Sequence, residues 1–210
     1  MWFITSIAST PKRTINWILV VATLLLTVTG VIFVYQYVDE NYNEKMDKKY
    51  KTLPVAKDFT LKKIEKIGDN SLVLTSDYKL FEEKTPFVLL HFWASWCVPC
   101  TVELPLYKDI ARKFDPKIFK IVGVLSYDSL ADVAKSRLLE TFAYTQLFDL
   151  YGEAAFLFKI KNLPTSFLLN ANRQIIFSLD EPLNEVSVKN FYAKLEKIVK
   201  GYRSEQEKSK

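Results

Sequence analysis

The sequence predicts an α/β domain, a mixed β-sheet flanked by helices, preceded by one membrane-spanning helix. Two apolar runs, 86–93 and 118–126, are typical of strands buried on both faces of a sheet. Segments with helical spacing alternate with the strand-like ones, in the order β-β-β-α-β-α-α-β-β-α. An uncharged run, 14–38, precedes them all.

The uncharged run 14–38 predicts an uncleaved membrane anchor. About 20 apolar residues in a helix cross the ~30 Å hydrocarbon core of a bilayer. Trp17 lies near one end and Tyr35 and Tyr37 near the other, where interfacial aromatic residues gather. A cleaved signal peptide or a buried core helix are the alternatives. The run exceeds a signal-peptide core of about 7–15 residues, and no small-x-small cleavage pattern follows it.

Charges around the run suggest its orientation. Lys12 and Arg13 precede it, and Asp39 and Glu40 follow it, which favours a short cytoplasmic N-terminus at 1–13. Four lysines beyond the run weaken this argument: Lys45, Lys48, Lys49 and Lys51. We expect a juxtamembrane linker at 39–53, a folded domain at 54–201 outside the cytoplasm, and a flexible tail at 202–210.

The domain is expected to begin with a β-hairpin, formed by 54–61 and 71–76 around a turn containing Gly68. A helix is predicted at 97–114, with a kink at Pro105 because proline lacks the N–H that would bond back one turn. Its apolar stripe is expected to comprise Val102, Leu106, Ile110 and Phe114.

The second half is expected to hold three helices and a second hairpin. Helices are predicted at 129–142, with Ser129 as N-cap, and at 149–158. Strands at 165–170 and 174–179 are separated by a short turn. An amphipathic helix at 184–202 closes the domain; its N-cap is expected to be Asn184 and its last turn to end at Gly201.

Composition excludes several classes of protein. The net charge of +5 comes from scattered lysines mixed with acids, which indicates a solvated surface, so no nucleic-acid partner is expected. Two cysteines are too few for a disulfide-rich scaffold. A structural zinc site normally takes four Cys or His ligands and this chain has three, so we expect neither metal nor cofactor.

Both cysteines lie in one C-x-x-C motif. Cys97 follows a buried strand and opens a helix, where free N–H groups and the helix dipole lower a thiol's pKa below about 8.5. Cys100 lies one turn further on. Attack by Cys97 on a disulfide gives a mixed disulfide that Cys100 resolves, so the spacing suits two-electron exchange. Half of a zinc site is the alternative, but no second pair is present.

The stretch "FWASWCVPC" resembles the active site of thioredoxin-like proteins. Together with "AKDFTL" upstream and "KIKNLPTSFLLN" downstream, "WCVPCTVELP" is similar to the membrane-anchored TlpA/ResA group. The resemblance covers 54–200. It implies a thioredoxin-like fold with an added N-terminal β-hairpin and a central insertion. It also implies thiol–disulfide exchange outside the cytoplasmic membrane, usually as a reductant and often for cytochrome c maturation.

The resemblance assigns roles to individual residues. Cys97 matches the exposed nucleophile and Cys100 the buried partner, which together would form the redox disulfide. Pro164 matches the cis-proline that faces the sulfurs; an ordinary loop proline is the alternative. Leu163 would offer its backbone to an extended substrate peptide. Trp96 is expected to pack the loop and to wall the substrate groove.

Two further residues are candidates for proton transfer. Glu103 matches the acidic residue of the TlpA/ResA group, and a buried carboxyl there could exchange a proton with Cys100; a solvated helix glutamate is the alternative. His91 stands where thioredoxins proper carry a buried aspartate. It could act as a proton relay with Glu103, but a hydrogen-bonded core histidine is the favoured interpretation.

The predicted function is therefore a single-pass protein of the bacterial cytoplasmic membrane that reduces disulfides of exported proteins, apocytochrome c among the candidates. A membrane thiol carrier would supply the electrons. Val-Pro between the cysteines resembles the Gly-Pro of reducing thioredoxins, whereas the CcmG/DsbE branch has an acidic residue after its cis-proline that this chain lacks.

Three alternatives remain. A disulfide oxidase or isomerase would use the same two sulfurs. A copper-binding assembly factor would hold Cu(I) on Cys97, Cys100 and His91, because thiolates suit that ion. A thiol peroxidase is disfavoured, since no Thr-x-x-Cys motif is present.

Overall fold

The computed structural model describes residues 17–50, 55–68, 71–136, 138 and 143–208. The chain divides into two compact units, Met1–Lys49 and Tyr50–Lys210, and each is described by itself. The predicted cytoplasmic segment 1–13 and the first residues of the predicted anchor, 14–16, lie outside the described residues.

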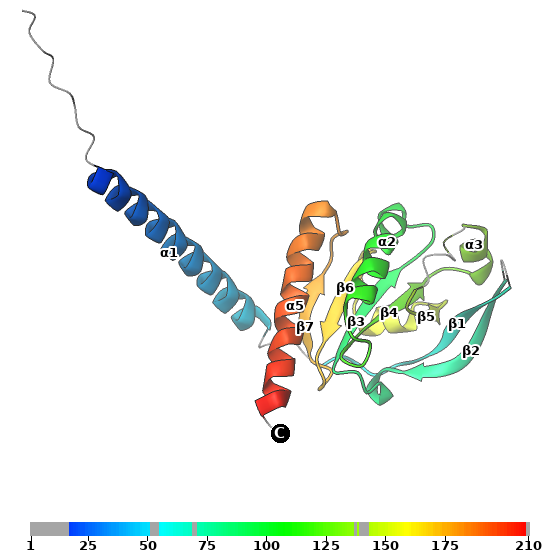
Figure 1. The fold of residues 1–210 in the computed structure, drawn as a ribbon. Helices are drawn as coiled ribbons and strands as arrows, with labels where there is room; N and C mark the ends of the chain where they lie inside the picture. Colours follow the sequence, from blue (N-terminus) through cyan, green and yellow to red (C-terminus); the bar gives the residue numbers. More distant parts are fainter. Residues whose placement is uncertain (1–16, 51–54, 69–70, 137, 139–142, 209–210) are drawn as a thin grey trace, which may run out of the picture. The chain divides into compact units, whose positions relative to one another are not determined.

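The described residues of the first unit lie in one helix, α1 (Trp17–Tyr50), which Figure 1 draws in blue. The helix covers most of the predicted anchor and continues through most of the predicted linker. Within the described stretches of the chain, no helix is long and apolar enough to cross a membrane.

The second unit is built on a mixed sheet whose strands follow the order β2-β1-β5-β4-β3-β6-β7. The β3–β4 and β4–β5 pairs are parallel and the remaining pairs are antiparallel. The strands are β1 (Thr60–Ile67), β2 (Ser71–Lys79), β3 (Phe87–Trp93), β4 (Phe119–Ser126), β5 (Thr145–Asp149), β6 (Thr165–Leu169) and β7 (Ile175–Leu179). The predicted mixed sheet is confirmed.

The helices of this unit are α2 (Val98–Lys113), α3 (Leu130–Lys135), α4 (Glu153–Leu157) and α5 (Glu185–Lys208), with a short 3-10 turn, η1 (Leu80–Glu82). Figure 1 shows α2 and α5 running next to each other across the sheet. The Phe114 ring, at the end of α2, lies 5.6 Å from the Tyr192 ring of α5, centroid to centroid, so the two helices share an aromatic contact.

Strand β3 occupies the centre of the sheet, and all seven of its residues are buried. This confirms the buried strand predicted at 86–93. His91, in the middle of β3, pairs with Gly123 of β4 on one side and with Ser166 of β6 on the other. At this position in the central strand, the histidine side chain lies in the interior of the domain.

The predicted hairpins are both present, with shifted boundaries. The first strand is β1, later in the chain than the predicted 54–61; Val55 forms only an isolated bridge with Gln174. Ser129 accepts a hydrogen bond from the Asp132 N–H as N-cap of α3, as expected. Strand β5 was not predicted, because its short segment carries the polar Gln146 inward and shows no clear alternation.

Two helix predictions are wrong. The buried face of α2 carries Cys100, Glu103, Leu104, Tyr107 and Ile110. Val102, placed in the predicted apolar stripe, is 68% exposed. In addition, α5 continues past Gly201 to Lys208, so 202–208 is helical rather than a loose tail. Gly201 lacks the positive φ of a C-terminal glycine cap, which explains why the helix does not stop there.

Candidate active site

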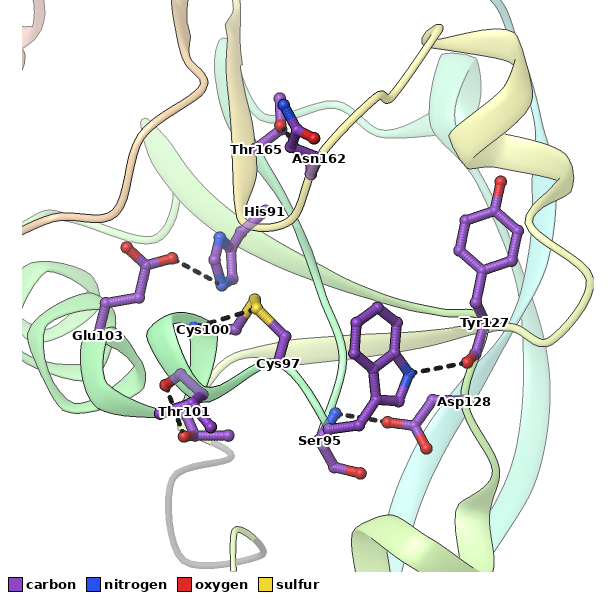
Figure 2. Close-up of a disulfide and its surroundings, with 12 residues drawn as sticks. His91, Ser95, Cys97, Cys100, Thr101, Glu103, Tyr127, Asp128, Asn162 and Thr165 are labelled. Carbon is purple, nitrogen blue, oxygen red and sulfur yellow. Dashed lines mark hydrogen bonds and ion pairs between the residues drawn. A yellow bond between two sulfur atoms is a disulfide. The ribbon is translucent and has the colours of Figure 1, made fainter.

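Cys97 and Cys100 form a disulfide at the start of α2, with 5.3 Å between their Cα atoms (Figure 2). Cys97 is the N-cap residue, and its sulfur accepts a hydrogen bond from the Cys100 N–H at 3.3 Å. The same N–H would face a Cys97 thiolate in the reduced protein. A helix start and a backbone donor both stabilise negative charge on sulfur, as the sequence predicts.

The two sulfur-bearing residues differ in access. Cys97 retains 5% exposure and Cys100 has none. Exposed apolar side chains flank the motif along the chain, since Trp96, Val98 and Val102 are all more than half exposed. A substrate can therefore reach Cys97 alone, while Cys100 can react only with its neighbour.

The Leu163–Pro164 peptide bond is cis, as expected from the resemblance. Leu163 packs against the core cluster that contains both cysteines, so the loop before β6 lies beside the disulfide. The Thr165 hydroxyl donates to the Asn162 carbonyl at 2.7 Å, which closes this loop locally.

Glu103 lies one turn beyond Cys100 and is 1% exposed. The Leu183 N–H donates to its Oε2 at 2.7 Å. Burial raises the pKa of Glu103 to about 8, and the hydrogen bond from Leu183 only partly opposes this shift. The alternative of a solvated helix glutamate is therefore wrong, and the side chain holds a proton at neutral pH.

His91 is fully buried, with Nδ1 3.0 Å from Ser166 Oγ and Nε2 3.6 Å from Glu103 Oε1. Figure 2 shows the imidazole and the Glu103 carboxyl group turned toward each other. Desolvation lowers the pKa of His91 to about 3, so the ring is neutral. Because Glu103 is also neutral at pH 7, the contact is not a salt bridge there.

The sequence also matches known proteins. Residues 54–178 match the AhpC/TSA family. The thiol-disulfide oxidoreductase ResA of Oceanobacillus iheyensis is 34% identical over 154 residues, which cover 72% of this chain and 74% of that protein. The chain belongs to the AhpC/TSA family, in its ResA-like group.

Solved structures related to this family have the same fold. A thiol:disulfide interchange protein DsbE from Chlorobium tepidum superposes with a TM-score of 0.57 and 27% identity, over 70% of this chain and 96% of that one. StoA from Bacillus subtilis gives 0.53 and 25%, over 66% and 96%. The fold is therefore thioredoxin-like, and the ResA-like chain is a thiol–disulfide oxidoreductase.

In this ResA-like site, sequence reasoning missed the loop between β4 and α3. The Trp96 indole N–H donates to the Tyr127 carbonyl at 3.0 Å, and the Ser95 N–H donates to the buried Asp128 carboxylate. Figure 2 shows both contacts, which hold the active-site loop against the end of β4. Tyr127 has a φ of 56°, and only a glycine at 152 leaves room for its ring.

The arrangement of possible metal ligands bears on the copper-binding alternative. Among the residues the structure describes, no three His, Cys, Asp or Glu side chains are grouped so as to hold an ion. The copper alternative would need His91 to join the two cysteines, but its nitrogens face Ser166 and Glu103.

Proposed function

We propose that this oxidoreductase is a membrane-anchored reductant that donates electrons to disulfides of proteins outside the cytoplasm. The observation that carries the proposal is the arrangement of a reachable sulfur, a sealed sulfur and a sealed carboxyl group along the first two turns of α2. Each of the three has a distinct part in the exchange of two electrons and one proton.

The exchange begins at Cys97. Its thiolate attacks one sulfur of the substrate disulfide; a mixed disulfide forms and the other substrate sulfur leaves as a thiolate. Cys100 then gives its proton to the Glu103 carboxylate and attacks Cys97 Sγ, which releases the second substrate thiolate and closes the enzyme disulfide. The enzyme thiols are oxidised and the substrate is reduced, with two electrons transferred.

The pKa of Glu103 suits this proton transfer. A proton moves most readily between groups of similar pKa. The ordinary pKa of a cysteine thiol is about 8.5, and that of Glu103 is about 8 in the oxidised structure. In the reverse direction, when a carrier reduces the enzyme disulfide, Glu103 returns the proton to the Cys100 thiolate.

Substrates would bind along the cis-proline loop and the aromatic wall. The Leu163 backbone would pair with an extended peptide next to Cys97, and Trp96, which is 61% exposed, would form a wall of the substrate groove. Exported proteins that carry a disulfide, including apocytochrome c, fit such a general site. Electrons would come from a membrane thiol carrier.

The membrane attachment rests on the sequence. Residues 14–38 contain no charged side chain. The large apolar side chains that the structure describes in this run are exposed along α1, Leu26 and Phe33 by about 70%. No helix in the described part of the chain meets the requirement for a membrane span. We propose that the uncharged run 14–38 is a single-pass anchor in the bacterial cytoplasmic membrane, with the redox domain on the outer side of that membrane.

The redox potential tests the direction of exchange. Equilibration of the full chain with glutathione buffers, followed by thiol alkylation and mass measurement, gives the potential of the Cys97–Cys100 pair. A reductant should fall at or below about −250 mV, near the ~−270 mV of thioredoxin. A value near the ~−120 mV of strong oxidants would instead support the oxidase alternative.

A further inference from the structure

A buried polar cluster lies behind the disulfide, where β3, β6 and α2 meet. It consists of His91 from β3, Ser166 from β6, and Tyr107 and Glu103 from α2, and none of the four is more than 1% exposed. Most buried polar side-chain atoms have at least one hydrogen-bond partner. The way these four are connected therefore bears on what they do.

Three of the four form a continuous chain. Tyr107 Oη lies 2.8 Å from Ser166 Oγ, which lies 3.0 Å from His91 Nδ1. The imidazole also stacks on the Tyr107 ring, with centroids 4.1 Å apart. The ring of His91 is thus fixed both at one nitrogen and across its face, and its second nitrogen is aimed at Glu103.

The fourth contact is left open in the oxidised structure. His91 Nε2 and Glu103 Oε1 stand 3.6 Å apart, and neither has a hydrogen bond. Unpaired buried polar atoms are unfavourable, and an approach of roughly 0.6 Å would bring them to the usual N–H···O distance of about 3.0 Å. The geometry leaves one hydrogen bond to be made at the place where Glu103 changes charge.

We propose that Tyr107, Ser166 and His91 form a hydrogen-bond chain that reverses its direction whenever Glu103 gains or loses its proton. With Glu103 ionised, Tyr107 donates to Ser166, Ser166 donates to Nδ1, and the Nε2–H donates to the carboxylate. With Glu103 protonated, the carboxyl O–H donates to Nε2, the Nδ1–H donates to Ser166, and Ser166 donates to Tyr107.

The imidazole carries one proton in both arrangements, and only the nitrogen that holds it changes. The single proton that differs is that of Glu103, which passes to or from Cys100. His91 is accordingly a positioning residue: it supplies a donor to the carboxylate and an acceptor to the acid. This inference rests on the proposed role of Glu103 and explains how a sealed carboxyl group can occupy both charge states.

The other groups around Glu103 explain why the ionised carboxylate needs a hydrogen bond from His91. The groups that interact with the Glu103 carboxyl are the Leu183 N–H, His91 Nε2, and the ionisable hydroxyls of Tyr107 and Tyr144. Burial raises the pKa values of Glu103, Tyr107 and Tyr144, and the charge of Glu103 further raises those of the two tyrosines. The Leu183 N–H lowers the pKa of Glu103. A second donor at Oε1 is what the ionised state lacks.

The chain contains a single histidine, so its state can be read without assignment. The test is nitrogen NMR of the oxidised full chain labelled with 15N-histidine, recorded from pH 5 to pH 10. Carbon NMR of 13C-labelled glutamate, assigned by its loss in Glu103→Gln, gives the Glu103 titration. We expect a neutral imidazole throughout, with its proton on Nδ1 at low pH and on Nε2 at high pH, and a midpoint shared with Glu103.

The variant Glu103→Gln should abolish the change. Its amide oxygen should accept the hydrogen bond from the Leu183 N–H, which leaves the NH2 group to donate to Nε2 and to hold the Nδ1–H form at every pH. Ser166→Ala should leave a mixture of the two forms, whereas Ser178→Ala, an exposed serine on the neighbouring strand, should behave as the wild type. A single tautomer across the Glu103 titration, or an imidazolium at pH 6, would overturn the proposal. The reduction of a substrate disulfide is measured with the same protein preparations. If that activity is retained while the imidazole keeps a single tautomer, the hydrogen-bond chain is wrong and the proposed oxidoreductase function still holds.

Discussion

At the scale of single residues, Cys97 and Cys100 differ in what can reach them. Cys97 keeps 5% exposure and accepts the Cys100 N–H, while Cys100 is sealed and adjoins the turn that carries Glu103. Their position at a helix start after a buried strand, and the greater burial of Cys100, agree with the sequence prediction. The charge states of Glu103 and His91 could not be predicted in this way, because they depend on which groups surround the side chains after folding.

The difference in access predicts which single-cysteine variant captures a substrate. Cys100→Ser should accumulate a mixed disulfide through Cys97 with a disulfide-bonded peptide, because the resolving sulfur is gone. Cys97→Ser should accumulate at least tenfold less, since Cys100 is out of reach. Mass spectrometry of the non-reduced protein measures both, and equal capture by the two variants would contradict the assignment.

The burial of Glu103 and His91 predicts how stability depends on pH. Their pKa values move from 4.5 to about 8 and from 6.5 to about 3. The raised pKa of Glu103 contributes stability that is lost as pH rises from 4.5 to 8. The lowered pKa of His91 contributes stability that is lost as pH falls from 6.5 to 3. Between pH 4.5 and 6.5 the two effects cancel, and above 6.5 only the loss from Glu103 remains.

The oxidised protein should therefore lose about 2 kcal/mol of unfolding free energy from these two groups between pH 6.5 and 8, at ~1.4 kcal/mol per pH unit for one proton. Denaturant unfolding of the wild type and of Glu103→Gln isolates the contribution, because the variant has no carboxyl group there. If both proteins change in parallel over this range, Glu103 is not held protonated by the fold.

At the scale of elements, predictions succeeded where burial on both faces or a local cap determines the outcome, as in β3 and α3. They failed where the neighbouring element determines which face of a helix is buried. The apolar stripe expected on α2 included Val102, but the buried face is set by Cys100, Glu103 and Tyr107 packing toward β3. A prediction based on the spacing of apolar residues does not detect polar residues on the buried face of a helix.

The loop contact between Tyr127 and Gly152 is an element-scale feature that substitution can test. A Cβ on residue 152 would lie 2.0 Å from the Tyr127 ring, and its φ is +72°. Gly68 has a similar φ of +63°, but nothing lies within 4 Å of the Cβ that an alanine would add there. The two glycines therefore form a matched pair.

We expect Gly68→Ala to destabilise the protein by about 1 kcal/mol, the order of the cost of a left-handed backbone for alanine. Gly152→Ala should cost at least ~1 kcal/mol more, because the Tyr127 ring must move. It should also change the intensity or wavelength of the intrinsic tryptophan fluorescence, since the Trp96 indole N–H is hydrogen-bonded to the Tyr127 carbonyl. Equal destabilisation and unchanged fluorescence would show that this loop does not position Trp96.

At the scale of the whole molecule, the chain combines a helix of exposed apolar residues with a ResA-like redox domain. The family, the fold and the oxidoreductase activity follow from the matched sequence and the observed site. The proposed function adds two claims to these: that electrons flow from the enzyme to its substrates, and that the redox domain lies outside the cytoplasm. A reductant outside the cytoplasm must receive its electrons from the cytoplasm. Its cysteines should therefore be kept largely as thiols in growing cells.

The most direct test is thiol trapping of Cys97 and Cys100 in intact cells with a maleimide that cannot cross the membrane. The account predicts that most of the protein is modified at Cys97 before any lysis, and that Cys100, which is sealed in the folded protein, is then found as a free thiol once the protein is denatured. If the pair is found mainly as a disulfide, or if Cys97 reacts only after the membrane is opened, the account of an extracytoplasmic reductant is contradicted.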